Sequence, residues 1–484
     1  MRALSPVNSI LCAALIACAL VALVTCEASA QAPAYPDSVS HTVQPLTFDG
    51  TGTSAWGPIS ATADSTALRP VDPSMSAWEY PVAGLWWLIK LPFALINHGF
   101  KALVYWRGDI PFFDTIERLL SRVPDFGLKA KAEWTPTSGF RYGAQLYENR
   151  PFDGNLHLQY TFVAGGRDDL VNTVGTRTFL GSSTWLDFVG SYHRRGAERF
   201  NGIGPGSSAD DESFFAGRYT WTGASLRQQF DHGLAAEARV LYSDVRNAGP
   251  RQLDRFDSTE DLFASDLPHG WSERSTGMSY EFEFMRDVTG TRGRGVRGGL
   301  QRAMVSYFQP TSGPGEEFLH YRLALEQFIG GSSPAGRQLA LKFSWSWMDG
   351  SDEVIHFQRL ITNHGADSFR GYHGFRFRDR GIIGGTAEYR YPVWDYGQVG
   401  GGLGADGYVF YDTGQVFSGH SNVRMRALTH SLGLGIRLVN ADDFMARVEV
   451  AGSRENFLFR FSVSQIFQHA KGGVFDGRVP IPMR

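Results

Sequence analysis

Residues 337–349 read RQLALKFSWSWMD, and their pattern decides the fold. Large apolar residues occupy alternate positions, and small or charged residues occupy most of the positions between them. The apolar positions are Leu339, Leu341, Phe343, Trp345 and Trp347, and the positions between them are Ala340, Lys342, Ser344 and Ser346. Because successive side chains of a strand point to opposite faces, this pattern predicts a strand with one apolar and one mostly polar face.

The same alternation recurs along most of the chain from residue 126 onward. It is clearest at 156–162, 234–242 and 457–463, where apolar residues again occupy every second position. Strands of this kind fit a barrel that has lipid outside and water inside. A soluble β-sandwich also alternates, but it buries its apolar face and usually has shorter strands.

Sixteen segments show this strand character. They lie near 127–135, 139–149, 154–164, 170–180, 184–195, 214–230, 233–245, 277–288, 298–309, 318–329, 337–349, 382–394, 399–416, 429–440, 444–455 and 457–467. Outer-membrane barrels have an even number of strands, and long external loops alternate with short periplasmic turns. The long connections here are all odd-numbered: 196–213, 246–276, 350–381 and 417–428. The sequence therefore predicts an all-β fold, a sixteen-stranded antiparallel transmembrane β-barrel over residues 126–467, closed so that no strand edge meets lipid.

The first 30 residues have the pattern of a secretory signal peptide. Arg2 precedes an apolar run over 10–24, and the residues 28–30 (ASA) form an A-x-A cleavage pattern. The three cysteines of the chain, Cys12, Cys18 and Cys26, all lie in this segment. Cys26 also allows a lipoprotein interpretation, although the threonine before it fits that poorly. Cleavage after residue 30 leaves no cysteine, which excludes a disulfide framework, a thiolate zinc site and a cysteine nucleophile.

Other parts of the chain have different compositions. Residues 31–75 are rich in Ser, Thr, Ala, Pro and Asp, and we expect a flexible tail. Residues 76–125 include the largely apolar run 81–106, which has several tryptophans and is interrupted by Lys90 and Lys101. This favours amphipathic helices in the membrane interface, the alternative being a helix packed under or inside the barrel. Residues 468–484 are expected to form a C-terminal extension. The net charge of −3 argues against a nucleic-acid partner, which would require a concentrated Lys/Arg surface.

Three motifs between residues 364 and 414 resemble the BamA/TamA-type bacterial surface-antigen superfamily, also called the outer membrane protein 85 superfamily. They are the loop motif Phe369-Arg370-Gly371-Tyr372, the strand GTAEYRYP at 385–392, and Phe410-Tyr411-Asp412. The family barrel has sixteen strands, and its signature loop joins the eleventh to the twelfth. In the count made from alternation, 350–381 occupies the same place. The resemblance covers roughly residues 126–467. The sequence departs from the larger members of the family, because the short N-terminal helical segment expected before the first strand shows no pattern of their POTRA modules.

The resemblance implies a contact that holds this loop inside the barrel. Alternation places Glu388 and Asp412 on the inward faces of neighbouring strands, where the guanidinium of Arg370 could meet them. The implied site, which we call the loop lock, comprises Phe369, Arg370, Gly371, Tyr372, Glu388, Phe410 and Asp412. We expect Gly371 to provide a tight bend. The alternative is that Arg370 is an external loop charge and the two acids line a solvated pore.

Two further segments leave alternatives open. The charges of FRFRDR at 375–380 could strengthen the lock or solvate the loop, and we expect solvation. The segment RFNGIG at 199–204 resembles a glycine-centred part of the family's third external loop, but it would serve equally well as an ordinary glycine-rich turn.

No enzymatic motif is visible, since the chain has no G-x-S-x-G, no H-E-x-x-H and no P-loop. We therefore expect no enzyme, no catalytic residue, no metal and no cofactor. The resemblance implies an outer-membrane protein of a Gram-negative bacterium that assists the insertion or translocation of protein or lipid through a lateral gate. Its implied partners are the lipid bilayer, the outer-membrane assembly machinery during biogenesis, and a protein or lipid client. The other hypothesis is a passive or plugged pore, or a structural barrel without insertase activity.

Overall fold

The computed structural model describes residues 126–135, 139–148, 156–165, 168–247, 257–292, 295–312, 317–330, 337–350, 353–363, 369–395, 404–439 and 444–462. All of them belong to one compact unit, Pro73–Arg484. The predicted signal peptide, tail, helical segment and C-terminal extension (1–30, 31–75, 76–125 and 468–484) lie outside the described residues.

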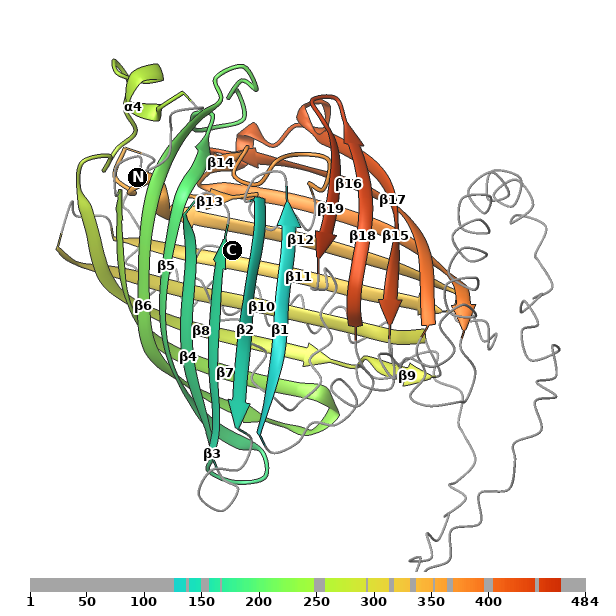
Figure 1. Cartoon of the computed structure of the whole chain (residues 1–484). Coiled ribbons are helices and arrows are strands. Elements are labelled where there is room, and N and C mark those ends of the chain that lie inside the picture. The colour runs from blue at the N-terminus through green and yellow to red at the C-terminus, as the bar shows by residue number, and fades with distance from the viewer. Residues whose placement is uncertain are drawn as a thin grey trace, which may run out of the picture. The chain divides into compact units, whose positions relative to one another are not determined.

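One large antiparallel sheet of seventeen strands forms most of the described structure (Figure 1). Its strands are β1 (Phe126–Thr135), β2 (Gly139–Glu148), β3 (Leu156–Gly165), β4 (Asp169–Phe179), β5 (Thr184–Phe200), β6 (Ser213–Gln229), β7 (Leu234–Asn247), β8 (Arg274–Asp287), β9 (Gly290–Arg292), β10 (Gly295–Ser312), β11 (Phe318–Gly330), β12 (Gln338–Asp349), β15 (Gly381–Asp395), β16 (Gly404–Phe417), β17 (Thr429–Val439), β18 (Phe444–Ser453) and β19 (Phe457–Ser462). Each strand of this list pairs with the next one, with one exception. Both β8 and β9 pair with β10. The fold class is thus all-β, as predicted.

The remaining elements are short. β13 (Ile361–Thr362) and β14 (Arg378–Asp379) form a separate two-stranded sheet. Among the described residues, the helices are α4 (Thr259–Leu262) and the 3-10 turns η4 (Asp231–Gly233), η5 (Phe357–Arg359), η6 (His420–Asn422) and η7 (Met425–Ala427). Within the described ranges, no helix has the length and apolar character needed to span a membrane.

Each of the sixteen predicted segments overlaps a strand of the sheet, and β9 is an additional strand that the pattern did not predict. At its end β5 is longer than predicted, because the pattern predicted an end near residue 195 and the strand ends at Phe200. The register between β5 and β6 shifts between Arg195 and Glu198. Because a bulge inserts extra residues into one strand, the period-two pattern breaks there while the backbone pairing continues.

The first and last of these strands also pair with each other. β1 and β19 are antiparallel neighbours at two register positions, Glu133 with Ser462 and Trp134 with Phe461. On its other side, β1 pairs with β2 along its whole length, from Phe126 to Thr135. We call the junction of β1 and β19 the seam.

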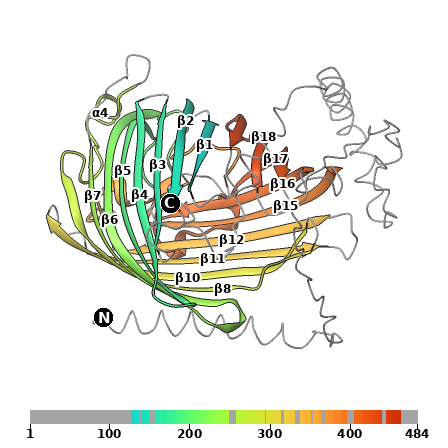
Figure 2. The same cartoon turned by 60° about the horizontal axis from the view of Figure 1, so that its bottom comes forward.

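The two faces of the sheet differ in the way the alternation predicts. On β8, Phe282 is 51% exposed and its neighbour Glu281 is 4% exposed, and on β4 the same contrast separates Val174 from Thr173. We call the face with buried polar residues the inner face, because the loop stretches 353–363 and 369–380 pack against it. The sheet curves around that side (Figure 2). Exposed apolar and buried polar side chains are the reverse of the arrangement in a soluble protein.

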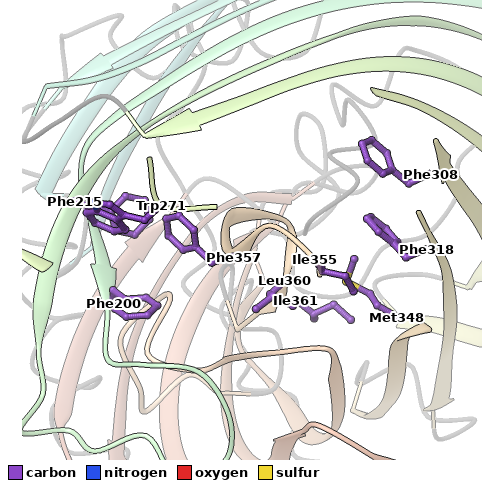
Figure 3. Packing of buried hydrophobic residues seen from close by; sticks show 10 residues of the cluster. All are labelled: Phe200, Phe215, Trp271, Phe308, Phe318, Met348, Ile355, Phe357, Leu360 and Ile361. Atoms are coloured by element: carbon purple, nitrogen blue, oxygen red, sulfur yellow. The ribbon is translucent and has the colours of Figure 1, made fainter. Parts of the chain in front are cut away.

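The main apolar core lies at one end of the inner face (Figure 3), where residues 353–363 pack between the ends of several strands. Its members are Phe200, Phe215, Trp271, Phe308, Phe318, Met348, Ile355, Phe357, Leu360 and Ile361. Phe357 stacks on Trp271 and meets Phe215 edge-on, at ring distances of 5.4 and 5.2 Å. The connections at this end include 201–212, 350–380 and 418–428, which are among the long ones. The core therefore anchors the loop between β12 and β15.

The outer apolar face gives a direct test of membrane contact. We expect Val174→Arg, in the middle of β4, to lower the free energy of unfolding in lipid vesicles by about 2–4 kcal/mol, because a charge near the bilayer centre loses its hydration. The matched control is Val423→Arg, at an exposed position outside the strands. Urea titration of the refolded protein measures both, and equal effects would contradict the assignment of this face to lipid.

Candidate functional site: the loop between β12 and β15

The loop between β12 and β15 turns back on itself and lies against the inner face. Its two described stretches, 353–363 and 369–380, are joined by the β13–β14 pairing, in which Ile361 is opposite Asp379. The backbone N–H of Asn363 donates to the carbonyl of Phe377, and the side chain of Asn363 accepts from the N–H of Phe377. These bonds hold the following segment, which contains Arg370, in a defined position.

The structure brings Arg370 together with Asp412 and Glu388. The side chain of Arg370 is fully buried, and it donates to both carboxylate oxygens of Asp412 at 2.9 and 2.7 Å. A third bond reaches Glu388 at 2.8 Å, and the backbone N–H of Arg370 also donates to Asp412 at 3.2 Å. Such a bidentate, charge-assisted arrangement is stronger and more directional than a single ion pair.

A third carboxylate, Glu449 on β18, completes the surroundings of Arg370. One oxygen of Glu449 lies 3.8 Å from the guanidinium and accepts a hydrogen bond from the hydroxyl of Tyr408. The sequence analysis missed Glu449, although alternation on β18 would place it on the inner face between two outward valines. The guanidinium also lies 3.3 Å from the centre of the Phe410 ring, so this motif residue contacts the cation directly.

The charge of Arg370 is stabilised by these neighbours. Burial alone disfavours a charged guanidinium, but the attraction and hydrogen bonds of Asp412, together with Glu388, outweigh it and raise the pKa of Arg370 above its ordinary value. A buried cation of this kind requires its partners, because removing them would leave an unpaired charge in the interior.

The role of Gly371 differs from the one expected. Its backbone is not in the left-handed region; instead, a side chain there would meet the Cβ atoms of Ser431 and Ser453 at 2.6 and 2.9 Å. Glycine is therefore required because the loop approaches β17 and β18 closely. Gly433 has a similar role, since a Cβ atom there would lie 2.3 Å from the ring of Phe410.

Phe369 and Tyr372 anchor the motif through apolar packing. Both are buried, and with Phe377 and Val416 they form a cluster between the loop and β16. The ring centroids of Phe369 and Tyr372 lie 5.6 and 5.1 Å from that of Phe377. All seven predicted residues of the loop lock are thus within one buried region, and Glu449 belongs to it as well.

The expectation that the charges at 375–380 solvate the loop is wrong. Arg376 and Arg378 are 4% and 1% exposed. Arg378 donates to Glu198 of β5 and to the carbonyl of Phe357, both at 2.7 Å. Because this part of the loop enters the interior, its cations are paired there instead of being hydrated.

Arg359 is a further cation that sequence reasoning missed. It donates to the hydroxyl of Ser275 at 2.6 Å and to that of Ser243 at 3.0 Å, and it lies 3.9 Å from the ring centre of Phe308. No pattern could have indicated it, since a loop residue has no periodicity to assign it to a face.

The loop also contacts the last hairpin of the sheet, β18–β19. Arg376 forms a bidentate pair with Glu455 at 2.9 and 3.1 Å, in the turn between these strands. Arg460 of β19 donates to the carbonyl of Tyr372 at 2.8 Å, and the hydroxyl of Ser453 donates to the backbone carbonyl of Gly371 at 2.7 Å. The loop therefore binds the strand that forms one side of the seam.

The segment 199–204 takes part in the same assembly. Its residues Arg199, Phe200 and Asn201 are buried, and the backbone N–H of Gly204 donates to the carbonyl of Arg378 at 2.8 Å. Gly202 and Gly204 have φ values of +93° and +94°, which favour glycine. This stretch is a glycine-rich turn, and it also contacts the loop. An ordinary turn and a family-like loop segment, the two alternatives for it, are therefore not exclusive.

The inner face also contains a buried Ser–His pair. The hydroxyl of Ser346 lies 2.7 Å from Nε2 of His320. On the other side of His320, the residue opposite on β10 is Ser306. Among the described residues, no group of three His, Cys, Asp or Glu side chains could hold a metal ion.

Comparison with solved structures identifies the fold. BamA from Haemophilus ducreyi lacking POTRA domains 1–3 matches with a TM-score of 0.50 and 13% identity, over 70% of this chain and 70% of that chain. The described sheet has a fold similar to that of this BamA structure. Two structures of CdiB are also similar. CdiB from Escherichia coli matches with a TM-score of 0.49 and 11% identity, over 71% of this chain and 63% of that chain. CdiB from Acinetobacter baumannii matches with a TM-score of 0.44 and 10% identity, over 70% of this chain and 59% of that chain, so the chain spans less than two thirds of each CdiB.

The comparisons by sequence gave no match. No protein-family model matches the chain, and no curated protein matches it. The likeness to BamA therefore describes the fold of the described strands, and the loop contacts have to be interpreted from their own geometry.

Replacement of Arg370 should destabilise the fold. We expect Arg370→Ala to lower the free energy of unfolding by about 3–5 kcal/mol, because it leaves buried carboxylates without their cation. Arg370→Lys should lower the free energy of unfolding by a smaller amount, because lysine keeps the charge. It should still be less stable than the native protein, because lysine cannot form the bidentate bonds.

Urea titration of the refolded protein measures these losses. The control is Arg426→Ala, at an exposed position in η7, where a change below about 0.5 kcal/mol is expected. If Arg370→Ala proved as stable as this control, the contact would not stabilise the loop.

A second prediction concerns His356, which precedes η5. Nδ1 of His356 accepts from the N–H of Gln358, and Nε2 lies 3.3 Å from the carbonyl of Glu273. Burial lowers the pKa of His356 to about 3. Because the unfolded chain takes up the proton near pH 6.5, the stability from neutral His356 is complete above that pH and is lost as the pH falls toward 3.

The stability of the His356→Gln variant should accordingly depend less on pH than that of the native protein. Urea midpoints measured between pH 7.5 and 4.5 test this, with His232→Gln, at an exposed turn, as the control. An unchanged slope in His356→Gln would show that this imidazole does not contribute.

Proposed function

We propose that the sixteen long strands close into an outer-membrane barrel, with the loop between β12 and β15 locked inside. The pairing of β1 with β19 supports closure. The exposed apolar face supports a lipid environment, because a closed barrel is the only way for a sheet to span a bilayer with its backbone groups paired. The BamA-like fold supports the same environment. In this arrangement β9 and the start of β10 form a short hairpin beyond the barrel.

We further propose that this barrel assists the insertion or translocation of protein or lipid through a lateral gate at the seam. The observation that carries the proposal is that the loop binds one side of the seam, through Arg460 of β19 and Glu455 of the β18–β19 turn. The seam joins the first and the last described strands, which are not consecutive in the chain, so no turn connects them there. Separation of these strands exposes backbone groups, and each unsatisfied group in lipid costs several kcal/mol, so contacts that hold β19 in place also hold the seam closed.

The loop contacts link the lock to this gate. Arg376 binds Glu455 in the β18–β19 turn, and Arg460 of β19 binds the carbonyl of Tyr372, only two residues after Arg370. A displacement of β19 must therefore break bonds to the loop. We infer that the locked loop keeps the seam closed and that release of the loop permits opening.

The proposed location of the protein is the outer membrane of a Gram-negative bacterium, where the bilayer and the assembly machinery are its partners. Its client is a protein or a lipid, and the chain is not proposed to be an enzyme. A plugged barrel without insertase activity is the second candidate, and it is favoured by the extensive core that packs residues 353–363 into the interior.

A disulfide across the seam distinguishes these two functions. Glu133→Cys combined with Ser462→Cys places two thiols at paired positions, and the predicted mature chain has no other cysteine. If the seam must open, the oxidised variant should fail to complement a strain that lacks the gene, and a reductant should restore growth.

The control is Ala144→Cys combined with Phe162→Cys, a pair within the continuous β2–β3 ladder. This crosslink should leave complementation intact. Full complementation by the oxidised seam variant would refute the lateral gate and favour the plugged barrel.

A further inference from the structure

Four arginines form a row on neighbouring strands of the sheet. Arg194 of β5 is opposite Arg218 of β6, Arg218 is opposite Arg246 of β7, and Arg246 is opposite Arg274 of β8. All four therefore stand at the same level on adjacent strands. We call this set the arginine row. Like charges directly opposite each other are unfavourable in a sheet, so such a row requires an explanation.

The arginine row lies on the outer, apolar face. Side chains of a strand alternate between its two faces, so residues that are an even number of positions apart lie on the same face. Arg194 shares its face with Phe188, which is 50% exposed, and Arg246 with Val240, which is 44% exposed. The positions between them, such as Ser191 and Ser243, are buried on the inner face.

The level of the row is the boundary of the apolar surface. Arg274 is the first residue of β8 and Arg246 the penultimate residue of β7, at the end of the sheet that bears the loop 353–380. Toward the other end, the same face presents Val240, Tyr280 and Phe282, which are 44–51% exposed. In the proposed membrane orientation, the row lies where lipid headgroups meet the hydrocarbon region.

The charges of the row are only partly balanced within the protein. Arg194 pairs with Asp168, and Arg274 forms a bidentate pair with Asp244 at 2.8 and 2.7 Å. No carboxylate among the described residues pairs with Arg218 or Arg246. The Nε of Arg218 is buried without a hydrogen-bond partner, and Arg246 is exposed. Two cations thus remain to meet an external anion.

The geometry of the row matches phosphate. Neighbouring strands lie about 4.8 Å apart, so the row spans roughly 14 Å along the membrane boundary. Guanidinium groups bind phosphate oxygens through parallel N–H bonds, and arginine is less strongly hydrated than lysine, which suits a site at the edge of lipid. An apolar surface directly beside the cations would contact the acyl chains of the same molecule.

We propose that β5–β8 bind the phosphate headgroup of an anionic lipid in the outer leaflet, with Arg218 and Arg246 as the main ligands. The inference rests on the proposed membrane location, but it does not depend on the lateral gate. The bound lipid would neutralise the row and fix the depth of this side of the barrel in the membrane.

The test is lipid binding by the full-length protein, refolded in detergent and titrated with short-chain phosphatidic acid in native mass spectrometry. Phosphatidylcholine of the same chain length is the comparison lipid. The native protein should bind phosphatidic acid more tightly than phosphatidylcholine. Arg218→Gln and Arg246→Gln should each weaken that binding about fivefold, from the contribution expected of one arginine near an anionic surface, and leave phosphatidylcholine binding unchanged.

The matched control is the double variant Arg424→Gln and Arg426→Gln, at two exposed positions outside the row. Equal affinity of the native protein for the two lipids would overturn the proposal, and so would equal losses in the row and control variants. Displacement of the lipid by millimolar inorganic phosphate would also overturn it in favour of an ion site.

Folding of each sample is checked by the shift of the unheated protein on a gel. If Arg218→Gln fails to fold, Arg246→Gln, at an exposed position, still gives the answer. A native protein without the gel shift would refute the barrel itself, whereas a shifted protein without lipid preference refutes only the lipid site.

Discussion

The buried guanidinium of Arg370 is the interaction on which the interior depends. Its carboxylate partners come from three strands, Glu388 on β15, Asp412 on β16 and Glu449 on β18. A cation in this position is stable only when the loop reaches all of them, because the cost of burial is recovered through attraction and hydrogen bonds together. The position of the loop and the arrangement of these strands therefore stabilise each other.

The two faces of the sheet balance their charges in different ways. The outer face presents apolar residues such as Phe282, and the inner face buries charges that the loop neutralises. On the inner face, the cations of the loop meet anions of the sheet, as Arg378 meets Glu198. On the outer face, at the arginine row, the sheet supplies cations that the protein itself only half neutralises, and the proposed complement comes from the lipid.

The strands could be predicted from the sequence because their period of two follows directly from backbone geometry. For the contact of Arg370 with Asp412 and Glu388, strand parity indicated only that both acids point inward, and the resemblance of the three motifs implied that Arg370 meets them. The pairing of Arg376 and Arg378 could not, because loop residues have no periodicity and charged loops are usually hydrated. The arginine row was equally hidden, since it exists only once the register of four strands is known.

The sequence separations of the loop contacts have a consequence for folding. Arg376 binds a residue 79 positions later, in the last hairpin, and Arg378 binds one 180 positions earlier, on β5. Contacts between such distant segments form slowly, because long stretches of chain must be ordered before they yield any stabilisation. The loop can thus form all of these contacts only after both the early and the final strands are in place, which makes its closure a late step of folding.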